Sequence, residues 1–196
     1  LEFRRVLFRS PLLYHNNKNG TFTDVSRTSG LTKFGNTIAV VAFDYDNDGR
    51  LDLMFGNYFR PKNLLDAEGI ASDPHVLPND LDNAVNGGGV TLWHGLGQGR
   101  WEEVTEKAGF GRHTGWTLDI GHGDFNNDGL QDVYLACDYG TDRVFFNNGD
   151  GTFRDATERA LGFDTRKGMN ADVGDYDNDG WLDVYVTNIT DEYMKE

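Results

Sequence analysis

Apolar and polar residues alternate over short stretches of this chain, and most of these stretches end at Gly, Asn or Asp. One group of four is "WTLDIGHG", "QDVYLAC", "RVFFNN" and "GTFRDAT", at 116–123, 131–137, 143–148 and 151–157. The stretches are rich in Val, Tyr, Phe, Leu and Thr, which favour extended backbone. No segment keeps the i, i+3, i+4, i+7 apolar spacing of an amphipathic helix. The pattern predicts short β-strands joined by tight turns.

The same set of strands recurs along the chain in a fixed register. A Gly-x-aromatic phrase appears in "NGTFTDV", "QGRWEEV" and "DGTFRDA", and a run of acidic residues begins 22 or 23 residues after each aromatic residue. Four antiparallel strands repeated about every 50 residues are typical of a β-propeller blade. We therefore predict an all-β protein, a partial β-propeller of about three blade-equivalents, each a four-stranded antiparallel blade.

The repeat divides the chain into segments. We expect a half blade over 11–34, a blade over 35–106, a blade over 107–158, and a truncated half blade over 159–196. An inserted loop is expected at 60–89, because that stretch holds three of the four prolines and ends in three glycines. Residues 1–10, "LEFRRVLFRS", resemble a translated sequencing adapter, and we exclude them from the fold. Since propellers close with about four to eight blades, we expect the chain to be a fragment.

Composition narrows the classes of partner. The formal net charge of the 196 residues is -14, which excludes nucleic acid and anionic membrane surfaces as natural partners. The hydrophobic share of 38% and the aromatic share of 13% indicate a folded protein. No apolar run approaches the roughly 18 residues that span a bilayer, so we expect no membrane insertion. A single cysteine, Cys137, excludes an internal disulfide.

The acidic runs are three versions of one nine-residue loop. They read "DYDNDGRLD", "DFNNDGLQD" and "DYDNDGWLD", at 44–52, 124–132 and 175–183. Side-chain oxygens at positions 1, 3, 5 and 9 and a backbone carbonyl at position 7 would surround one hard cation, and Gly at position 6 allows the sharp turn. Oxygen ligands of this number favour Ca²⁺, with Mg²⁺ as an alternative, whereas Zn²⁺ would require nitrogen or sulfur.

The loops differ from an EF-hand at their ends. An EF-hand finishes with a bidentate Glu at position 12. Here position 12 is Phe55, Leu135 or Val186, in a stretch with strand alternation. The last ligand is instead the Asp at position 9, so we set the EF-hand and dockerin interpretations aside.

These phrases resemble a known family. The loops, the following "LDLMFGN" and "LDVYVTN", and "NNGDGTFRDAT" are similar to the FG-GAP or VCBS repeats of integrin-type β-propellers. More narrowly, "YHNNKNGTFTDVSRTSGL" and "AFDYDNDGRLDL" resemble the bacterial relatives of cartilage acidic protein, which are often associated with an ASPIC/UnbV domain. The resemblance implies up to three Ca²⁺ ions. The implied ligands are Asp44, Asp46, Asp48, the Arg50 carbonyl and Asp52; Asp124, Asn126, Asp128, the Leu130 carbonyl and Asp132; and Asp175, Asp177, Asp179, the Trp181 carbonyl and Asp183.

The three loops are not expected to bind equally. Asn126 stands where the other loops have Asp, so the second loop carries one charge less, and we predict that it is the weakest site. A loop that supplies five ligands leaves little open coordination, so we expect the ion to be structural and not catalytic.

Other polar and aromatic residues have structural explanations. His15 and His94 occupy equivalent repeat positions and are expected at strand ends. His122 with Asp119 could line a central channel, and His75 could belong to a ligand site in the insertion. Blade cores need bulky aromatics, so we expect core positions for the tryptophans that could otherwise stack on sugars, Trp93, Trp101 and Trp116.

Three functional classes follow from these patterns. The first is a calcium-binding propeller of an extracellular, periplasmic or cell-surface protein that acts in adhesion, protein interaction or binding of a protein or glycan ligand. The second is part of a lyase-like enzyme acting on polysaccharides. The third is a structural scaffold domain of a larger protein. The sequence contains no catalytic motif, so we expect no enzyme activity.

Overall fold

The structure is a computed structural model that describes residues 12–33, 35–60, 77–80, 82–111, 113, 115–162, 164 and 166–189. The predicted foreign segment 1–10 lies outside these residues. So do His75 and most of the predicted insertion at 60–89.

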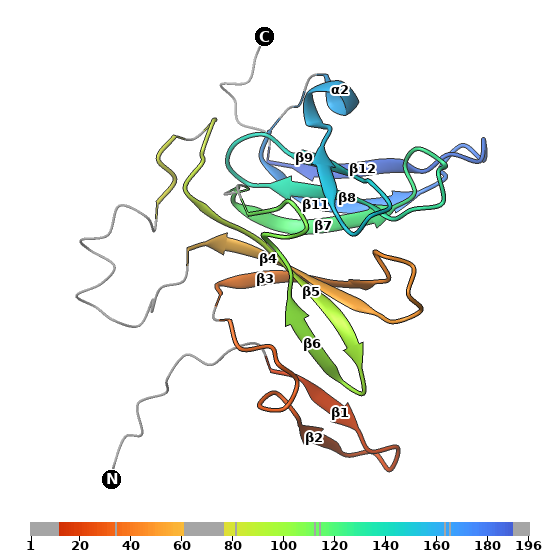
Figure 1. Ribbon diagram of the computed structural model, residues 1–196. Helices are drawn as coiled ribbons and strands as arrows, with labels where there is room; N and C mark the ends of the chain where they lie inside the picture. The colour runs from red at the N-terminus through yellow and green to blue at the C-terminus, as the bar shows by residue number, and fades with distance from the viewer. Residues whose placement is uncertain are drawn as a thin grey trace.

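Two complete four-stranded antiparallel sheets form the centre of the molecule (Figure 1). The first, blade 1, is β3 (Thr37–Phe43), β4 (Asp52–Phe59), β5 (Gly87–Gly97) and β6 (Arg100–Glu103). The second, blade 2, is β7 (Thr117–Gly123), β8 (Asp132–Cys137), β9 (Arg143–Asn147) and β10 (Phe153–Asp155). In each sheet the strands are paired in chain order. The predicted all-β fold with blades of the β-propeller type is confirmed.

Two further sheets have only two strands among the described residues. The N-terminal half blade is β1 (Tyr14–Asn16) with β2 (Phe22–Asp24), and the C-terminal half blade is β11 (Gly168–Gly174) with β12 (Asp183–Asn188). By the repeat, β1 and β2 correspond to the third and fourth strands of a blade, whereas β11 and β12 correspond to the first and second. The described helix, α2 (Thr157–Leu161), is a single short turn after β10.

Alternation explains the strands that the sequence predicts. In β7 and β8 the register places Ile120 opposite Leu135 and Gly123 opposite Asp132. All six residues of β8 are buried, because neighbouring sheets cover both of its faces. One boundary differs from expectation: β5 begins at Gly87, inside the stretch assigned to the insertion, because Gly87 and Gly89 pair with β4.

The sheets pack face to face along the chain. β3 packs against β7, and β7 packs against β11. Small residues allow close approach: a Cβ added at Gly56 would lie 2.9 Å from Thr117 Cγ2, and one at Gly121 would lie 2.9 Å from Val173 Cγ2. The main core cluster joins Met54 and Leu92 of blade 1 to Val133 and Leu135 of blade 2. Burial between successive sheets therefore holds the blades in order.

The connection after each outer strand also reaches the next blade. Phe110 lies between the rings of Phe145 and Phe153, with centroids 4.8 Å and 4.9 Å away. In the described part of the chain, the search for a helix long and apolar enough to cross a membrane finds none.

Candidate metal centre

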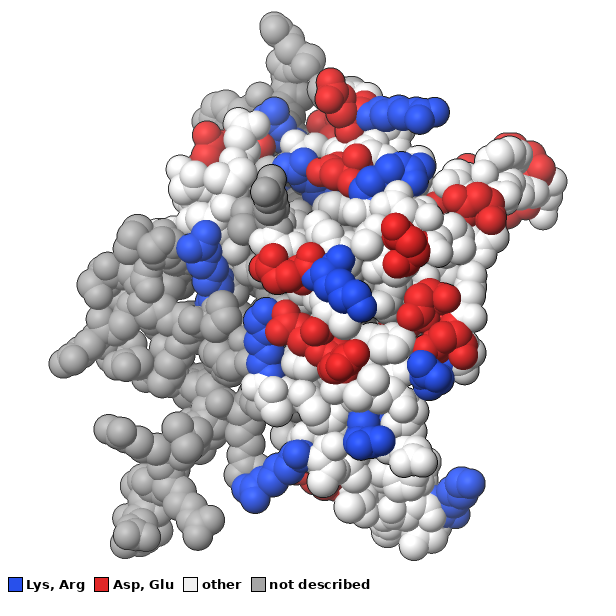
Figure 2. All heavy atoms as spheres, in the orientation of Figure 1, with Lys and Arg blue, Asp and Glu red and all other residues white. Residues whose placement is uncertain are grey.

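Each acidic loop joins the two inner strands of one sheet. Loop 1 (44–52) connects β3 to β4, loop 2 (124–132) connects β7 to β8, and loop 3 (175–183) connects β11 to β12. The three loops lie at the same edge of the stacked sheets (Figure 1). On the face drawn in Figure 2, acidic side chains gather at this edge, whereas acidic and basic side chains are mixed elsewhere.

The turn itself is built by two residues with left-handed backbone. Position 4 is Asn in every loop, with φ of 57°, 56° and 63°, and position 6 is Gly, with φ of 82°, 86° and 88°. Asn and Gly tolerate this conformation better than other residues. The Asn at position 4 was missed by the sequence analysis, although its presence in all three copies is visible in the sequence.

Main-chain donors orient the first carboxylate. The Asp at position 1 accepts hydrogen bonds from the N–H groups at positions 5 and 6. In loop 1 these are Asp48 N to Asp44 Oδ1 at 3.1 Å and Gly49 N to Asp44 Oδ2 at 2.8 Å. Loops 2 and 3 repeat both bonds within 2.7–3.0 Å. The position-5 carboxylate in turn accepts the position-7 N–H in each loop at 2.8–2.9 Å.

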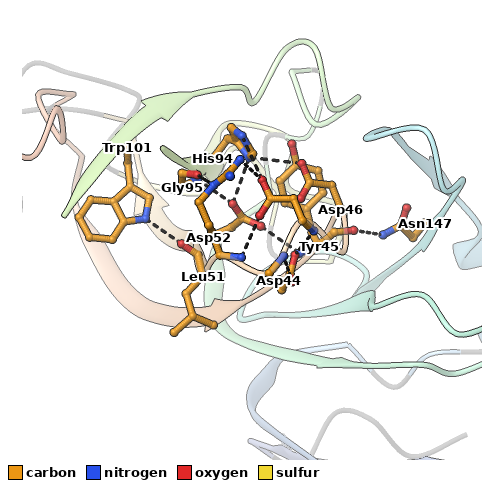
Figure 3. Close-up of polar contacts among 12 residues, drawn as sticks. Asp44, Tyr45, Asp46, Leu51, Asp52, His94, Gly95, Trp101 and Asn147 are labelled. Atoms are coloured by element: carbon orange, nitrogen blue, oxygen red, sulfur yellow. Dashed lines mark hydrogen bonds and ion pairs between the residues drawn. The ribbon is translucent and has the colours of Figure 1, made fainter. Parts of the chain in front are cut away.

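The Asp at position 9 closes each loop. Asp52 is fully buried, and its two oxygens accept the N–H groups of Tyr45 at 2.9 Å and Gly95 at 2.7 Å (Figure 3). Asp132 is equally buried and accepts Phe125 N–H at 3.0 Å and Asn147 N–H at 2.8 Å. The second donor in each case comes from the third strand of the blade.

Burial raises the pKa of both closing carboxyls. For Asp52 and Asp132 the main cause is desolvation, opposed by the two main-chain hydrogen bonds, and neighbouring loop carboxylates add to the increase. The same burial, together with the charge of Asp46, raises the pKa of Tyr45 to about 12. The loops therefore hold negative charge in positions where water solvates it poorly.

The structure brings the predicted ligands of loops 1 and 3 together. Oxygens of Asp44, Asp46 and Asp48 lie within 4.8 Å of one another, and so do those of the third-loop residues Asp175, Asp177 and Asp183. Among the described residues, no three acidic or histidine side chains of loop 2 meet this limit, because position 3 is Asn126. The Arg50, Leu130 and Trp181 carbonyls belong to the same turns, and their role as ligands stays a prediction.

His94 is the unexpected member of loop 1. The sequence analysis assigned it to a strand end, but its Nδ1 lies 3.3 Å from Asp46 Oδ2 and 3.2 Å from Asp52 Oδ1 (Figure 3). The Nδ1 atom is buried and makes no hydrogen bond of good geometry to any described group. The equivalent residue of blade 2 is Phe146, so loop 1 has a nitrogen ligand candidate that loop 2 does not have. Only the register of β5 against β4 reveals this contact.

Successive loops are also linked to each other. Asn47 Nδ2 donates to the Gly129 carbonyl at 3.4 Å, and Asn127 Nδ2 donates to the Gly180 carbonyl at 3.4 Å. Asn147 adds a shorter link between blades, because its Nδ2 donates to the Tyr45 carbonyl at 2.7 Å (Figure 3). The three candidate sites therefore form one row.

The donor set fits a hard divalent cation. Each loop holds three carboxylate or amide side chains and a closing carboxylate, which is buried in loops 1 and 2 and exposed in loop 3. In loop 1, main-chain hydrogen bonds orient the first and the last carboxylate. Oxygen ligands of this kind match Ca²⁺, which accepts irregular geometry. A bound cation would offset the cost of burying Asp52 and Asp132.

The remaining candidates have structural contacts. His122 stacks on Phe43 with centroids 4.9 Å apart and bonds to Gln131 at 2.9 Å. Asp119 accepts the Ala171 N–H at 3.0 Å. The expected core positions are confirmed for Trp93 and Trp116, which are buried.

The comparisons with known proteins agree with this geometry. The profile of the FG-GAP-like repeat matches residues 8–55, 79–135 and 124–186. The first two segments each contain one complete acidic loop, and the third contains loops 2 and 3. No curated protein matches the chain. Since the repeat covers most of the sequence, the chain belongs to the family of FG-GAP-like repeat proteins.

Proposed function

We propose that the three acidic loops bind Ca²⁺, and that the chain is a calcium-stabilised propeller segment of an extracellular, periplasmic or cell-surface protein. The observation that carries this proposal is the buried carboxylate at position 9. Asp52 and Asp132 are each fully buried at the end of a row of loop oxygens, where both of their hydrogen-bond donors are main-chain N–H groups and, at Asp52 alone, the His94 ring also lies 3.2 Å away. A burial of that kind is costly unless a cation compensates it.

The ion would act on the fold. It would join positions 1, 3 and 5 of the loop to position 9 at the start of the next strand, and so fix the turn between the two inner strands. Binding to the folded state alone stabilises that state by mass action. The proposal assigns no catalytic step to the chain.

The location follows from the type of site. Loops with irregular oxygen ligands bind Ca²⁺ in modules exposed to about millimolar calcium, and that concentration is found outside the cytoplasm. Blades held in this way would present loops and sheet edges to a protein or glycan ligand in adhesion or protein interaction. The phrases around Phe22 and Asp44 favour the narrower relationship with the cartilage-acidic-protein-like group that is associated with ASPIC/UnbV domains.

Calcium titration by calorimetry tests the proposal, with a reciprocal exchange at position 3. Asp46→Asn gives loop 1 the position-3 residue of loop 2, and Asn126→Asp gives loop 2 the four carboxylates of loop 1. We expect the first change to weaken one site and the second to strengthen one, each on the order of tenfold, because ligand charge tunes calcium affinity.

Asn148→Asp is the matched control, since it adds one carboxylate on an exposed turn outside the loops. If the unaltered chain binds no Ca²⁺ at millimolar concentration, the proposal is contradicted. Equal affinities of all three loops, unchanged by the exchange, would contradict the predicted weakness of loop 2.

A further inference from the structure

His94, from strand β5, brings an imidazole nitrogen to the carboxylates of loop 1. Its Nδ1 atom lies 3.3 Å from Asp46 Oδ2 and 3.2 Å from Asp52 Oδ1 (Figure 3). We propose that His94 is a metal ligand, and that it makes loop 1 selective for a divalent d-block metal ion such as Zn²⁺ or Mn²⁺ over Ca²⁺. This inference rests on the proposed function, because loop 1 must first be a cation site.

The Nδ1 atom of His94 is buried and makes no hydrogen bond in the described part of the chain. It is close enough to both carboxylate oxygens to form one, so its in-plane axis is aimed at neither oxygen. A buried polar atom without a partner is costly. Two ligand atoms that each lie about 2.0–2.2 Å from one Zn²⁺ ion are roughly 3 Å apart. The spacing of the nitrogen and the two oxygens therefore fits one shared metal ion.

The rest of the ring is positioned as in a metal-bound histidine. Its Nε2 faces Asp48 Oδ2 at 3.7 Å, and the ring meets Tyr45 edge to face, with centroids 6.1 Å apart and an interplanar angle of 83°. A histidine that binds a metal through one nitrogen usually directs the other toward a carboxylate. The contact with Asp48 favours a proton on Nε2, and that tautomer leaves the Nδ1 lone pair available to a metal.

Arg50 directs a bound cation toward His94. The Arg50 guanidinium forms an ion pair with Asp48 within the same loop, so the charge of that carboxylate is partly neutralised. Among the described residues, no arginine or lysine forms an ion pair with Asp46 or Asp52. The two carboxylates that keep their full attraction for a cation are therefore the two that His94 faces.

Blades 1 and 2 differ at this position and at its neighbour across the strands. His94 pairs with Glu102 between β5 and β6. The equivalent pair in blade 2 is Phe146 with Arg154, whose guanidinium carbon lies 5.3 Å from the centre of the Phe146 ring. One blade thus has a nitrogen ligand and an acid at these repeat positions, whereas the other has an apolar ring and a base. The first combination attracts a cation and the second does not.

The type of donor decides which ion is preferred. Ca²⁺ and Mg²⁺ take oxygen ligands, whereas an imidazole nitrogen suits Zn²⁺ and its d-block neighbours. For a given set of nitrogen and oxygen ligands, affinity rises from Mn²⁺ to Zn²⁺. The His94 nitrogen should therefore add much to the binding of Zn²⁺ and little to the binding of Ca²⁺.

Calorimetric titration with Zn²⁺ in calcium-containing buffer tests the inference, since only a site that prefers Zn²⁺ binds it there. His94→Phe gives blade 1 the residue that blade 2 has at this position. His15→Phe is the matched control, because His15 has the same repeat position and is exposed. We expect His94→Phe to weaken Zn²⁺ binding at least about tenfold and to leave Ca²⁺ binding within about twofold. The control should change neither, with both variants folded by circular dichroism.

Pulsed electron paramagnetic resonance of bound Mn²⁺ is the second test, and it needs no altered side chain. In the unaltered chain with Ca²⁺ present, the ion should show coupling to a histidine nitrogen, and labelling with ¹⁵N-histidine should change that coupling. His15→Phe should keep the coupling, and His94→Phe should lose it.

The possible results separate this inference from the proposed function. Equal Zn²⁺ affinities of the unaltered chain and His94→Phe, or bound Mn²⁺ without histidine coupling, would overturn the inference and leave calcium binding by the loops standing. Tighter binding of both Ca²⁺ and Zn²⁺ by His94→Phe would also overturn it, because the ring would then act as a positive charge in place of the ion. If the unaltered chain binds no divalent ion at all, both the inference and the proposed function fail.

Discussion

At the scale of the residue, the molecule is marked by three carboxylates that are buried and accept hydrogen bonds from main-chain N–H groups. Asp52, Asp132 and Asp142 are all fully buried. The first two close acidic loops, whereas Asp142 lies away from them and accepts hydrogen bonds from Cys137 N at 2.7 Å and Tyr134 Oη at 2.7 Å. Burial raises the pKa of all three carboxyls. Asp142 is thus a site where burial can be studied apart from metal binding.

The raised pKa of Asp142 gives stability a definite dependence on pH. Desolvation raises this pKa to about 6, above its ordinary value of 3.8. Between those values the folded state binds more protons than the unfolded state, so stability falls as pH rises through about 4 to 6. In calcium-free buffer, this carboxyl should lower the free energy of unfolding by up to roughly 3 kcal/mol as the pH rises through that range. We expect the Asp142→Asn variant to lack this part of the pH dependence.

Urea unfolding at a series of pH values measures this effect. Glu102→Gln, at an exposed acid of β6, serves as the control and should leave the slope unchanged. If the curves of the unaltered chain and of Asp142→Asn run parallel between pH 4 and 7, Asp142 does not carry the predicted dependence.

At the scale of the element, the turn that follows the outer strand of one sheet packs against the strands of the next blade. Phe110 is the best example, because it is buried and lies between the rings of Phe145 and Phe153. Leu31 has the same place before blade 1, where it packs with Phe55 and Trp93. These contacts connect elements that would otherwise be joined only by short backbone segments.

Phe110→Ala should therefore destabilise blade 2 as a unit. Removing a buried aromatic ring leaves a cavity, and we expect the free energy of unfolding to fall by about 3–5 kcal/mol. Leu77→Ala, at a side chain that is 70% exposed, is the control and should change stability by less than about 0.5 kcal/mol. Chemical denaturation of both variants measures the difference, and similar losses would show that Phe110 does not connect the blades.

At the scale of the whole molecule, the acidic loops are a row of charges on a chain whose net charge is -14. The bonds from Asn47 to Gly129 and from Asn127 to Gly180 join neighbouring loops. A cation bound in one loop therefore also reduces the repulsion between that loop and the neighbouring acidic loop. Stability of the assembly of blades should depend on divalent cations more than on ionic strength.

We expect the unfolding temperature to rise with calcium concentration. At 100 times the dissociation constant, one site adds about 2.7 kcal/mol to the free energy of unfolding. Magnesium should give a smaller increase, because it prefers fewer protein ligands and more water. Sodium chloride of equal ionic strength is the control, and an equal increase with that salt would mean that screening, and not binding, stabilises the fold.

The sequence predicts the strands and the loops well, because both depend on local patterns. The alternation around Asp132 and the Gly at position 6 are sufficient to place β8 and its turn. The contact of His94 with Asp46 is not predictable in this way, since it depends on the register of β5 against β4. The bond from Asn147 to the Tyr45 carbonyl likewise depends on how two sheets pack, and no local pattern records that.

Cys137 gives the protein a probe of its own motion. It is the only cysteine of the chain, it has no exposed surface, and burial raises the pKa of its thiol. A thiol reagent can therefore label it only in molecules whose β8 has opened. The labelling rate reports the opening of blade 2 without any engineered reporter. Slower labelling in calcium would show how far the influence of a loop extends into the sheet beside it.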